Sequence, residues 1–183
     1  MEYQLPTIVE KIKFAREGAA VHHVHAQPGL HPYQVGMHTF NMLTMLRILK
    51  PDASLNLVWA VVKHDIPERV TCDVSHPAKA AGILNREAQM WWEKLLNEQA
   101  FGEHTEEILT PMERMWLAGL DMLEFYCWCK DQIMMGNRMM ETKKLAVERY
   151  MIKYAGKYPE VIVDAYHAIK MHHWHTLPDI GEE

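Results

Sequence analysis

A histidine and an aspartate stand side by side in the stretch KHDIPERVTCDV, and two more carboxylates follow closely. These residues are His64, Asp65, Glu68 and Asp73. On a helix, positions three and four apart are neighbours, so the Glu68 carboxylate is expected beside both members of the doublet. Imidazole and carboxylate groups bind divalent metals and transfer protons. The stretch therefore indicates either the centre of a metal site or a helix end with ordinary charges.

Two further polar residues stand alone in apolar segments with helical spacing. His38 lies in VGMHTFNMLTML, and Asp121 lies in MWLAGLDMLEFYCW. A buried aspartate is costly unless a cation or hydrogen bonds compensate its charge. With His64 and Asp65, these residues form a set of nitrogen and oxygen ligands for a divalent transition metal that leaves positions for water and substrate. Each also has a structural interpretation, His38 as a hydrogen-bonded packing residue and Asp121 as an acceptor for a nearby tryptophan or tyrosine.

Other residues with ligand-forming side chains have simpler interpretations. The strings HHVH and HHWH, at residues 22–25 and 172–175, could hold a second metal, but histidines in loops and tails are normally solvated. Cys127 and Cys129 are about 200° apart around a helix axis, so they cannot hold one ion together. We expect both thiols to be packing residues.

The elements that must position these residues are helices. Apolar residues recur at spacings of three and four along almost the whole chain, without the sustained alternation of a strand. The sequence predicts an all-α fold, with one domain over residues 1–183 built as a bundle of six to eight helices. Helices are expected at roughly 6–18, 35–49, 54–66, 85–99 and 110–136, from 137 onward, and at 158–173.

The helix that begins at Ser54 brings the doublet into the molecule. Its segment LNLVWAVV is nearly all apolar, so we expect it to be buried on several faces and to carry His64 and Asp65 to an interior cleft near its end, where Pro67 disturbs it. The tryptophan pair Trp91 and Trp92 is expected to face either the core or a subunit interface.

Composition excludes several classes of protein. No apolar run approaches the roughly 18 residues that span a bilayer, and the first residues mix charges into the apolar pattern, so neither a membrane segment nor a signal peptide is expected. The 3 cysteines have no regular spacing, which favours a reducing cytoplasm over a disulfide scaffold. The net charge is -5 with both signs interspersed, so a nucleic acid polymer is not an expected partner.

The order His38, His64-Asp65, Asp121 resembles the H…HD…D signature of the HD-domain phosphohydrolases, an all-helical superfamily of metal-dependent enzymes. The segment HDIPERVTCDVSHPAK is also similar to the HD-x-x-E-x-x-T-x-D-x-x-x-P-x-K pattern of small bacterial 5′-deoxynucleotidases and of related phage dATP triphosphohydrolases. Every fixed position of that pattern is filled. The resemblance runs from the first helix through the helix of Asp121, and it implies the HD-domain type of helical bundle.

The resemblance implies a role for each matching residue. The metal ligands that it implies are His38, His64, Asp65 and Asp121. Glu68 becomes the acid/base that works with Asp65 at the catalytic centre. Asp73 is placed near the sugar or water, and Pro77 and Lys79 are placed beside the base and phosphates. These roles agree with the residue types, because a divalent metal acidifies water, a carboxylate can shuttle its proton, and a lysine can balance phosphate charge.

Two positions depart from the family pattern. Family members usually carry Arg-Trp in the loop ahead of the first ligand, and this chain has His23-Val24 there. The resemblance therefore makes His23 the substrate contact that replaces a phosphate-binding arginine. The usual glutamate before the first ligand is Met37, which removes one polar neighbour but no ligand.

The resemblance implies a hydrolase that cleaves the bond between the α-phosphorus and the 5′-oxygen of a deoxynucleotide, with zinc, cobalt, manganese, iron or magnesium as its divalent metal ion. The specific expectation is conversion of dATP to deoxyadenosine and triphosphate, because the compact length and the loop AREGAAVHHVHAQPGL look closer to the phage enzymes. One alternative is a 5′-deoxynucleotidase that releases phosphate from dNMPs. Another is a non-catalytic HD-fold module that binds nucleotide. The resemblance also suggests a homo-oligomer, either a dimer or a hexamer, and a phage-encoded protein in a host cytoplasm.

Overall fold

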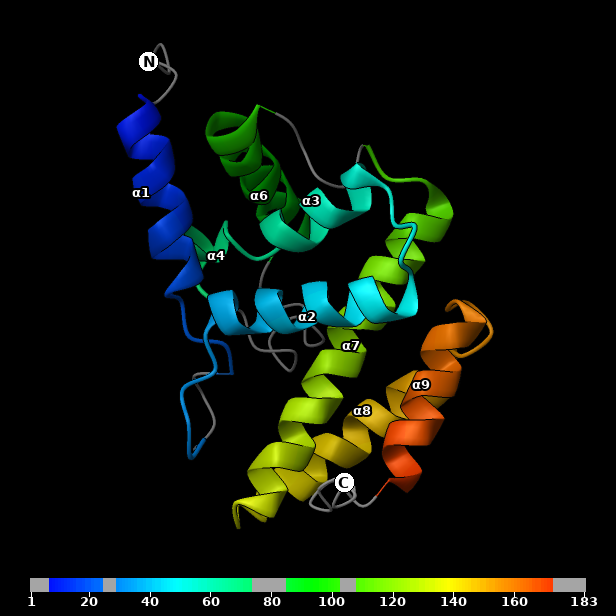
Figure 1. The fold of residues 1–183 in the computed structure, drawn as a ribbon. Coiled ribbons are helices and arrows are strands. Elements are labelled where there is room, and N and C mark those ends of the chain that lie inside the picture. The colour runs from blue at the N-terminus through cyan, green and yellow to red at the C-terminus, as the bar shows by residue number, and fades with distance from the viewer. Residues whose placement is uncertain (1–6, 25–28, 74–84, 103–107, 173–183) are drawn as a thin grey trace, which may run out of the picture.

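The computed structural model describes residues 7–24, 29–73, 85–102 and 108–172, and every regular element of at least one full turn within them is a helix. Figure 1 shows their arrangement. The all-α prediction is confirmed. The helices are α1 (Ile8–Ala19), α2 (Val35–Leu49), α3 (Leu55–Lys63), α4 (Glu68–Thr71), α6 (Arg86–Phe101), α7 (Pro111–Met134), α8 (Met140–Tyr154) and α9 (Glu160–Met171).

The longest helix, α7, contacts α2, α3, α8 and α9 and crosses the molecule between them (Figure 1). It starts where the sequence predicts. The Thr110 side chain accepts a hydrogen bond from the Glu113 backbone N–H, and the Glu113 side chain accepts one from the backbone N–H of Thr110. Pro111 occupies the first helical turn, where a proline is well tolerated. Apolar residues of α2, α3, α7, α8 and α9 form the main core. This core holds α2, α3 and α7 in fixed positions, and these three helices carry or adjoin the candidate ligands.

The chain changes direction between α3 and α4, at the histidine-aspartate doublet. The sequence predicts a helix over 54–66 that Pro67 disturbs, and in the structure α3 ends at Lys63 and Glu68 begins α4. Pro67 explains the break, because a proline ring clashes with the carbonyl four residues earlier, which here is that of Lys63. The backbone N–H of Glu68 donates to the Asp65 carbonyl at 3.0 Å, so a tight turn replaces the helix. His64 and Asp65 therefore lie at a helix end, where both side chains can face one point.

The segment before α2 is held against that helix by backbone hydrogen bonds. The N–H of His23 donates to the Tyr33 carbonyl at 2.7 Å, and the N–H of Val35 donates to the Val21 carbonyl at 2.9 Å. An isolated antiparallel bridge pairs His22 with Gln34. These contacts place His23 beside the start of α2, although it is remote in sequence from the other candidate site residues.

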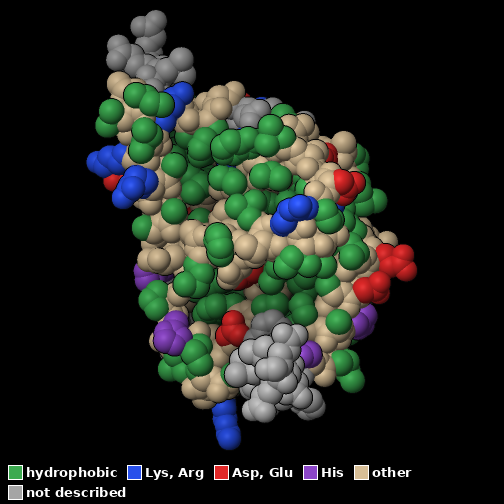
Figure 2. Space-filling view, in the orientation of Figure 1, with side chains coloured by type: hydrophobic (Ala, Val, Ile, Leu, Met, Phe, Trp, Pro, Cys, Tyr) green, Lys and Arg blue, Asp and Glu red, His purple; other side chains and the backbone are tan. Residues whose placement is uncertain are grey.

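The surface exposes several large apolar side chains. In Figure 2 they gather over the upper half of the visible face, where Figure 1 places α1, α3 and α6. Trp91 and Trp92 of α6 are 56% and 43% exposed, so the expectation that they face the core of this chain is wrong, and the subunit interface stays a prediction. Cys127 and Cys129 are buried, as predicted. Among the helices within the described ranges, none combines the length and apolar character needed to cross a membrane.

Candidate metal centre

His38 lies deep in the molecule, in the second turn of α2, and is held on one side by a buried carboxylate. Its Nδ1 is 2.7 Å from Glu124 Oε2, and both side chains are only 2% exposed. Tyr33 donates its hydroxyl to the same carboxylate, and Asn41 Nδ2 donates to the other oxygen at 2.8 Å. An ionised carboxylate only accepts, so Glu124 holds the proton of the ring on Nδ1 and directs Nε2 toward the site.

His64 is fixed in a similar way from the end of α3. Its Nδ1 is 2.9 Å from the Val61 carbonyl, which can only accept a hydrogen bond, so this nitrogen is the donor. Its Nε2 faces His38 Nε2 at 3.3 Å. Two imidazoles are thus oriented through their Nδ1 atoms so that both Nε2 atoms point to one place, which is the arrangement expected of histidine ligands with their outer partners.

Two carboxylates complete this group. Asp65 Oδ2 lies 2.8 Å from His64 Nε2 and 3.6 Å from His38 Nε2, and Asp121 Oδ1 lies 3.4 Å from His38 Nε2. Ligands about 2.0–2.2 Å from one ion are separated by about 3.0–3.5 Å in octahedral or tetrahedral geometry. The spacing and the chemistry of these donors therefore fit a divalent metal ion. Within the part of the chain that the structure describes, His38, His64 and Asp121 form one of three groups of side chains that could hold one.

Neighbouring charges raise the pKa of His38 and lower the pKa of Asp65. Burial works to lower the pKa of His38, but the hydrogen bonds that its ring donates to Asp121 and Glu124 outweigh it and raise that pKa well above its usual value. Burial works to raise the pKa of Asp65, but the rings of His64 and His23 outweigh it and hold that pKa well below its usual value. The carboxylates thus favour a positive charge between them, and a divalent ion can replace the protons that the histidines otherwise carry.

The proposed ligands differ in how far their side chains are exposed to solvent. The side chains of His38 and His64 are 2% and 13% exposed, whereas that of Asp121 is 41% exposed. Asp121 is therefore not the buried aspartate that its apolar helix suggests. It lies at the edge of the site, where a substrate can approach from solvent.

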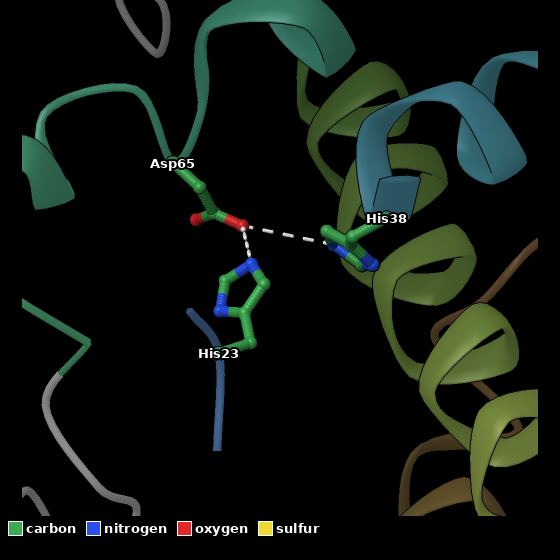
Figure 3. Close-up of side chains that lie close together, drawn as sticks. All are labelled: His23, His38 and Asp65. Atoms are coloured by element: carbon green, nitrogen blue, oxygen red, sulfur yellow. Dashed lines mark ion pairs between the residues drawn. The ribbon is translucent and has the colours of Figure 1, made fainter. Parts of the chain in front are cut away.

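His23 joins the cluster at the same carboxylate oxygen of Asp65 that His38 faces. Figure 3 shows His23 and His38 both directed at the Asp65 carboxylate, with His23 Nε2 3.1 Å from Oδ2. The other ring nitrogen, Nδ1, is 3.4 Å from Glu68 Oε2. The His23 side chain is only 11% exposed, so this residue lies inside the cluster rather than on an open binding surface.

Glu68 and Asp73 lie next to His23. Glu68 is in the first turn of α4, and its side chain is 11% exposed. Asp73 Oδ2 accepts from the backbone N–H of Val24 at 2.5 Å, which ties the two segments together. Val24 has a φ of 54°, a conformation that a β-branched residue rarely adopts. Two other sequence-predicted contacts, Pro77 and Lys79, lie outside the described residues.

Sequence reasoning missed Glu124 and Tyr33. Glu124 follows Asp121 by three positions on α7, so the two carboxylates share a helix face, and this spacing could have signalled a partner for a ligand. Tyr33 lies in a loop without periodicity, and its contact with Glu124 spans 91 positions in the chain. No local pattern predicts such a contact.

Comparison with known proteins supports the fold. No protein-family model and no curated protein matches the sequence. Among solved structures, the chain is similar to the HD phosphohydrolase DatZ of cyanophage S-2L bound to dA and one catalytic Zn²⁺ ion, with a TM-score of 0.66 over 91% of this chain and 95% of that one. The two sequences are 13% identical, so the likeness establishes the all-α fold of the HD-domain type.

Proposed function

We propose that the protein is a metal-dependent phosphohydrolase that acts on deoxynucleotides, with dATP as substrate and deoxyadenosine and triphosphate as products. One observation carries the proposal: ligand atoms of His38, His64 and Asp121, from three separate parts of the chain, lie within 4.8 Å of one another. Asp65 Oδ2 adjoins two of them, at 2.8 Å from His64 Nε2 and 3.6 Å from His38 Nε2. The similar DatZ structure contains dA and a catalytic Zn²⁺ ion, which supports the metal and the substrate class.

The chain would hold the metal through both histidines and both aspartates. When bound, a divalent ion supplies stabilisation of negative charge on phosphoryl oxygens and makes water more acidic. Glu124 would keep the His38 ring oriented, and the Val61 carbonyl would do the same for His64. Zinc, cobalt, manganese and magnesium remain the candidate ions, because imidazole and carboxylate ligands accept each of them.

Glu68 is the proposed acid/base. One imidazole ring, that of His23, separates its carboxylate from Asp65, so Glu68 borders the region where the α-phosphate would lie. Glu68 would accept a proton from the attacking water as the new oxygen–phosphorus bond forms. It would then deliver a proton to the 5′-oxygen as the bond to the α-phosphorus breaks. Asp65 takes part as the ligand nearest to this carboxylate.

The proposed substrate contacts come from the family pattern. Asp73 lies beside His23 and Glu68, which agrees with a place near the sugar or water. Pro77 and Lys79 stay predictions from the family pattern. His23, predicted as a phosphate contact, lies against Asp65 and Glu68 instead of at an open surface.

A substrate panel tests the proposal. The purified protein would be incubated with cobalt or manganese and each dNTP and dNMP, with and without a chelator, and the products would be separated. Release of triphosphate from dATP, lost on chelation, is the expected result. Orthophosphate from dNMPs alone would establish the 5′-deoxynucleotidase alternative. Nucleotide binding without any turnover in every metal would establish the non-catalytic module.

A further inference from the structure

We propose that Arg69 is a positioning residue, which holds helix α4 against α1 and thereby fixes the carboxylate of Glu68. The consequence for catalysis rests on the proposed function, in which Glu68 is the acid/base. The position of α4 itself can be measured without any substrate.

Helix α4 is too short to be stable by itself. It consists of one turn, Glu68–Thr71, and its N-cap residue, Pro67, provides no side-chain hydrogen bond. Within this turn, the backbone N–H of Cys72 donates to the Glu68 carbonyl at 2.8 Å. A single helical turn fixes several backbone dihedral angles for very few hydrogen bonds, so an isolated turn is unstable in water. The position of the Glu68 side chain therefore depends on the elements that α4 contacts.

One face of α1 provides such a contact. Helices α1 and α4 touch, and Figure 1 shows α4 beside the C-terminal half of α1. Phe14, Glu17 and Gly18 are three and four positions apart, so they lie on the same face of α1. Phe14 and Glu17 contact the side chain of Arg69. Gly18 packs against Ile66, in the turn before α4, so this face of α1 holds both the turn and the helix that follows it.

Arg69 makes two contacts with α1. Its Nε donates to Glu17 Oε2, and its guanidinium group lies over the Phe14 ring, 5.2 Å from the ring centroid. A planar guanidinium group that meets both a carboxylate and an aromatic face has few possible orientations. The hydrogen bond from Arg69 lowers the pKa of Glu17, which keeps this carboxylate ionised near neutral pH. Because exposed ion pairs contribute little to global stability, we expect this pair to act on the position of α4.

Glu68 directly precedes Arg69 and points to a different side of the turn. The two side chains are about 100° apart around the helix axis, and Glu68 Oε2 lies 3.4 Å from His23 Nδ1. A proton-transferring group must lie within hydrogen-bond reach of the reacting atoms, and a misplacement of about 1 Å can cost about 10²-fold in rate. Helix α6 also contacts α4, so loss of the Arg69 contact should loosen α4 without releasing it.

A double-mutant cycle between Glu17 and Arg69 tests the proposal. Arg69→Gln and Glu17→Gln each remove one partner of the pair, and each is expected to lower kcat by about 10-fold, with an unchanged KM for dATP and unchanged bound metal. The double variant should lose no more than either single variant, because both changes act through the same contact. Arg69→Lys keeps the charge and should recover part of the rate.

Lys13→Gln is the matched control. Lys13 Nζ lies 3.5 Å from the other carboxylate oxygen of Glu17, but both residues belong to α1, so the change should leave kcat as in the wild type. Additive losses in the double variant, or a loss in Arg69→Gln that Glu17→Gln does not share, would overturn the proposal. Arg69 would then act on Glu68 through its charge and not through α1.

Hydrogen exchange followed by mass spectrometry measures the position of α4 directly. The amides of Val70 and Cys72 donate to carbonyls of the same turn, so the peptide that contains them should exchange faster in Arg69→Gln and Glu17→Gln. Lys13→Gln should exchange at the wild-type rate, and the same rate in the other two variants would overturn the proposal. A wild type that hydrolyses no deoxynucleotide would refute the proposed function, and the exchange rates would then decide whether the pair fixes α4.

Discussion

The side chain of His38 lies between a buried carboxylate and the proposed ion. Three donors, from Tyr33, Asn41 and the His38 ring, reach the Glu124 carboxylate, and both His38 and Glu124 are 2% exposed. This arrangement fixes the ring before any metal arrives, so little ordering remains to be done on binding. The Glu124 carboxylate is therefore expected to increase the affinity of the site for metal, although it does not face the ion.

We expect Glu124→Gln to weaken binding of the metal by about 10–100-fold, because a neutral amide is a poorer acceptor for the His38 Nδ1 proton and adds its own donors to a site already filled with them. Metal affinity would be measured by competition with a chromogenic chelator. Glu148→Gln is the control, since Glu148 also accepts from a tyrosine, Tyr126, but lies on α8 away from the cluster. Equal affinities for the two variants would contradict the role of Glu124.

Asp65 and Glu68 should respond differently to substitution. Asp65→Ala removes a proposed ligand, so loss of the metal and of all turnover is expected. Glu68→Gln should keep the metal and lose about 10²–10⁴-fold in rate, the usual contribution of a positioned acid/base. Metal content and kcat at saturating metal measure the two effects. Full activity of Asp65→Ala would refute the site.

At the level of elements, the turn between α3 and α4 depends on its contact with α1. Gly18 of α1 is buried, and a Cβ added there would lie 2.7 Å from the carbonyl oxygen of Ile66, which is backbone and directly follows Asp65. Helix α1 can approach this turn closely only because Gly18 has no side chain. The position of the Asp65 carboxylate is thus set partly by a helix that contributes no ligand.

Gly18→Ala is expected to lower the free energy of unfolding by about 1–3 kcal/mol, because the added methyl group must displace backbone. It should also weaken metal binding, because Ile66 can move only with Asp65. Gly156→Ala is the matched control, as a Cβ there meets nothing within 4 Å. Urea unfolding and a metal titration of both variants make the comparison. A Gly18→Ala protein as stable as the control, with the same metal affinity, would contradict the close contact.

For the molecule as a whole, burial in the core around α7 is expected to determine which cysteine thiols an alkylating reagent can reach. Burial raises the pKa of the Cys127 and Cys129 thiols to about 12, whereas Cys72 is exposed. A thiol alkylates through its thiolate, so a buried thiol with a raised pKa is doubly protected near neutral pH. Reaction at these two positions therefore requires the molecule to open.

Alkylation of the folded protein with iodoacetamide at pH 8 should modify Cys72 and leave Cys127 and Cys129 intact, and all three should react in concentrated urea. Mass spectrometry of the digested protein gives the extent of labelling at each position. Rapid labelling of Cys129 without denaturant would show that the packing of α7 opens more easily than its burial implies. The expected dimer or hexamer is a separate prediction, which light scattering on the intact protein measures.

The sequence by itself determined much of the local structure and the identity of the proposed ligands. Helical spacing predicted the all-α fold and a helix over 110–136, which in the structure begins after the cap at Thr110, because such signals act within a few residues. The pattern from His64 to Lys79 contains two of the proposed ligands. Pro67 predicted the end of the helix that carries His64 and Asp65, but not the tight turn that joins it to α4.

Only the tertiary structure decided which distant residues meet. Glu124 and Tyr33 lie 86 and 5 positions from His38, and the placement of His23 between Asp65 and Glu68 depends on the pairing of residues 21–23 with 33–35. Such contacts follow from how α2 and α7 pack and how the loop returns to α2, and the spacing along the chain contains no signal for them. The sequence therefore supplied the proposed ligands, while packing supplied the carboxylate behind His38 and the position of His23 between Asp65 and Glu68.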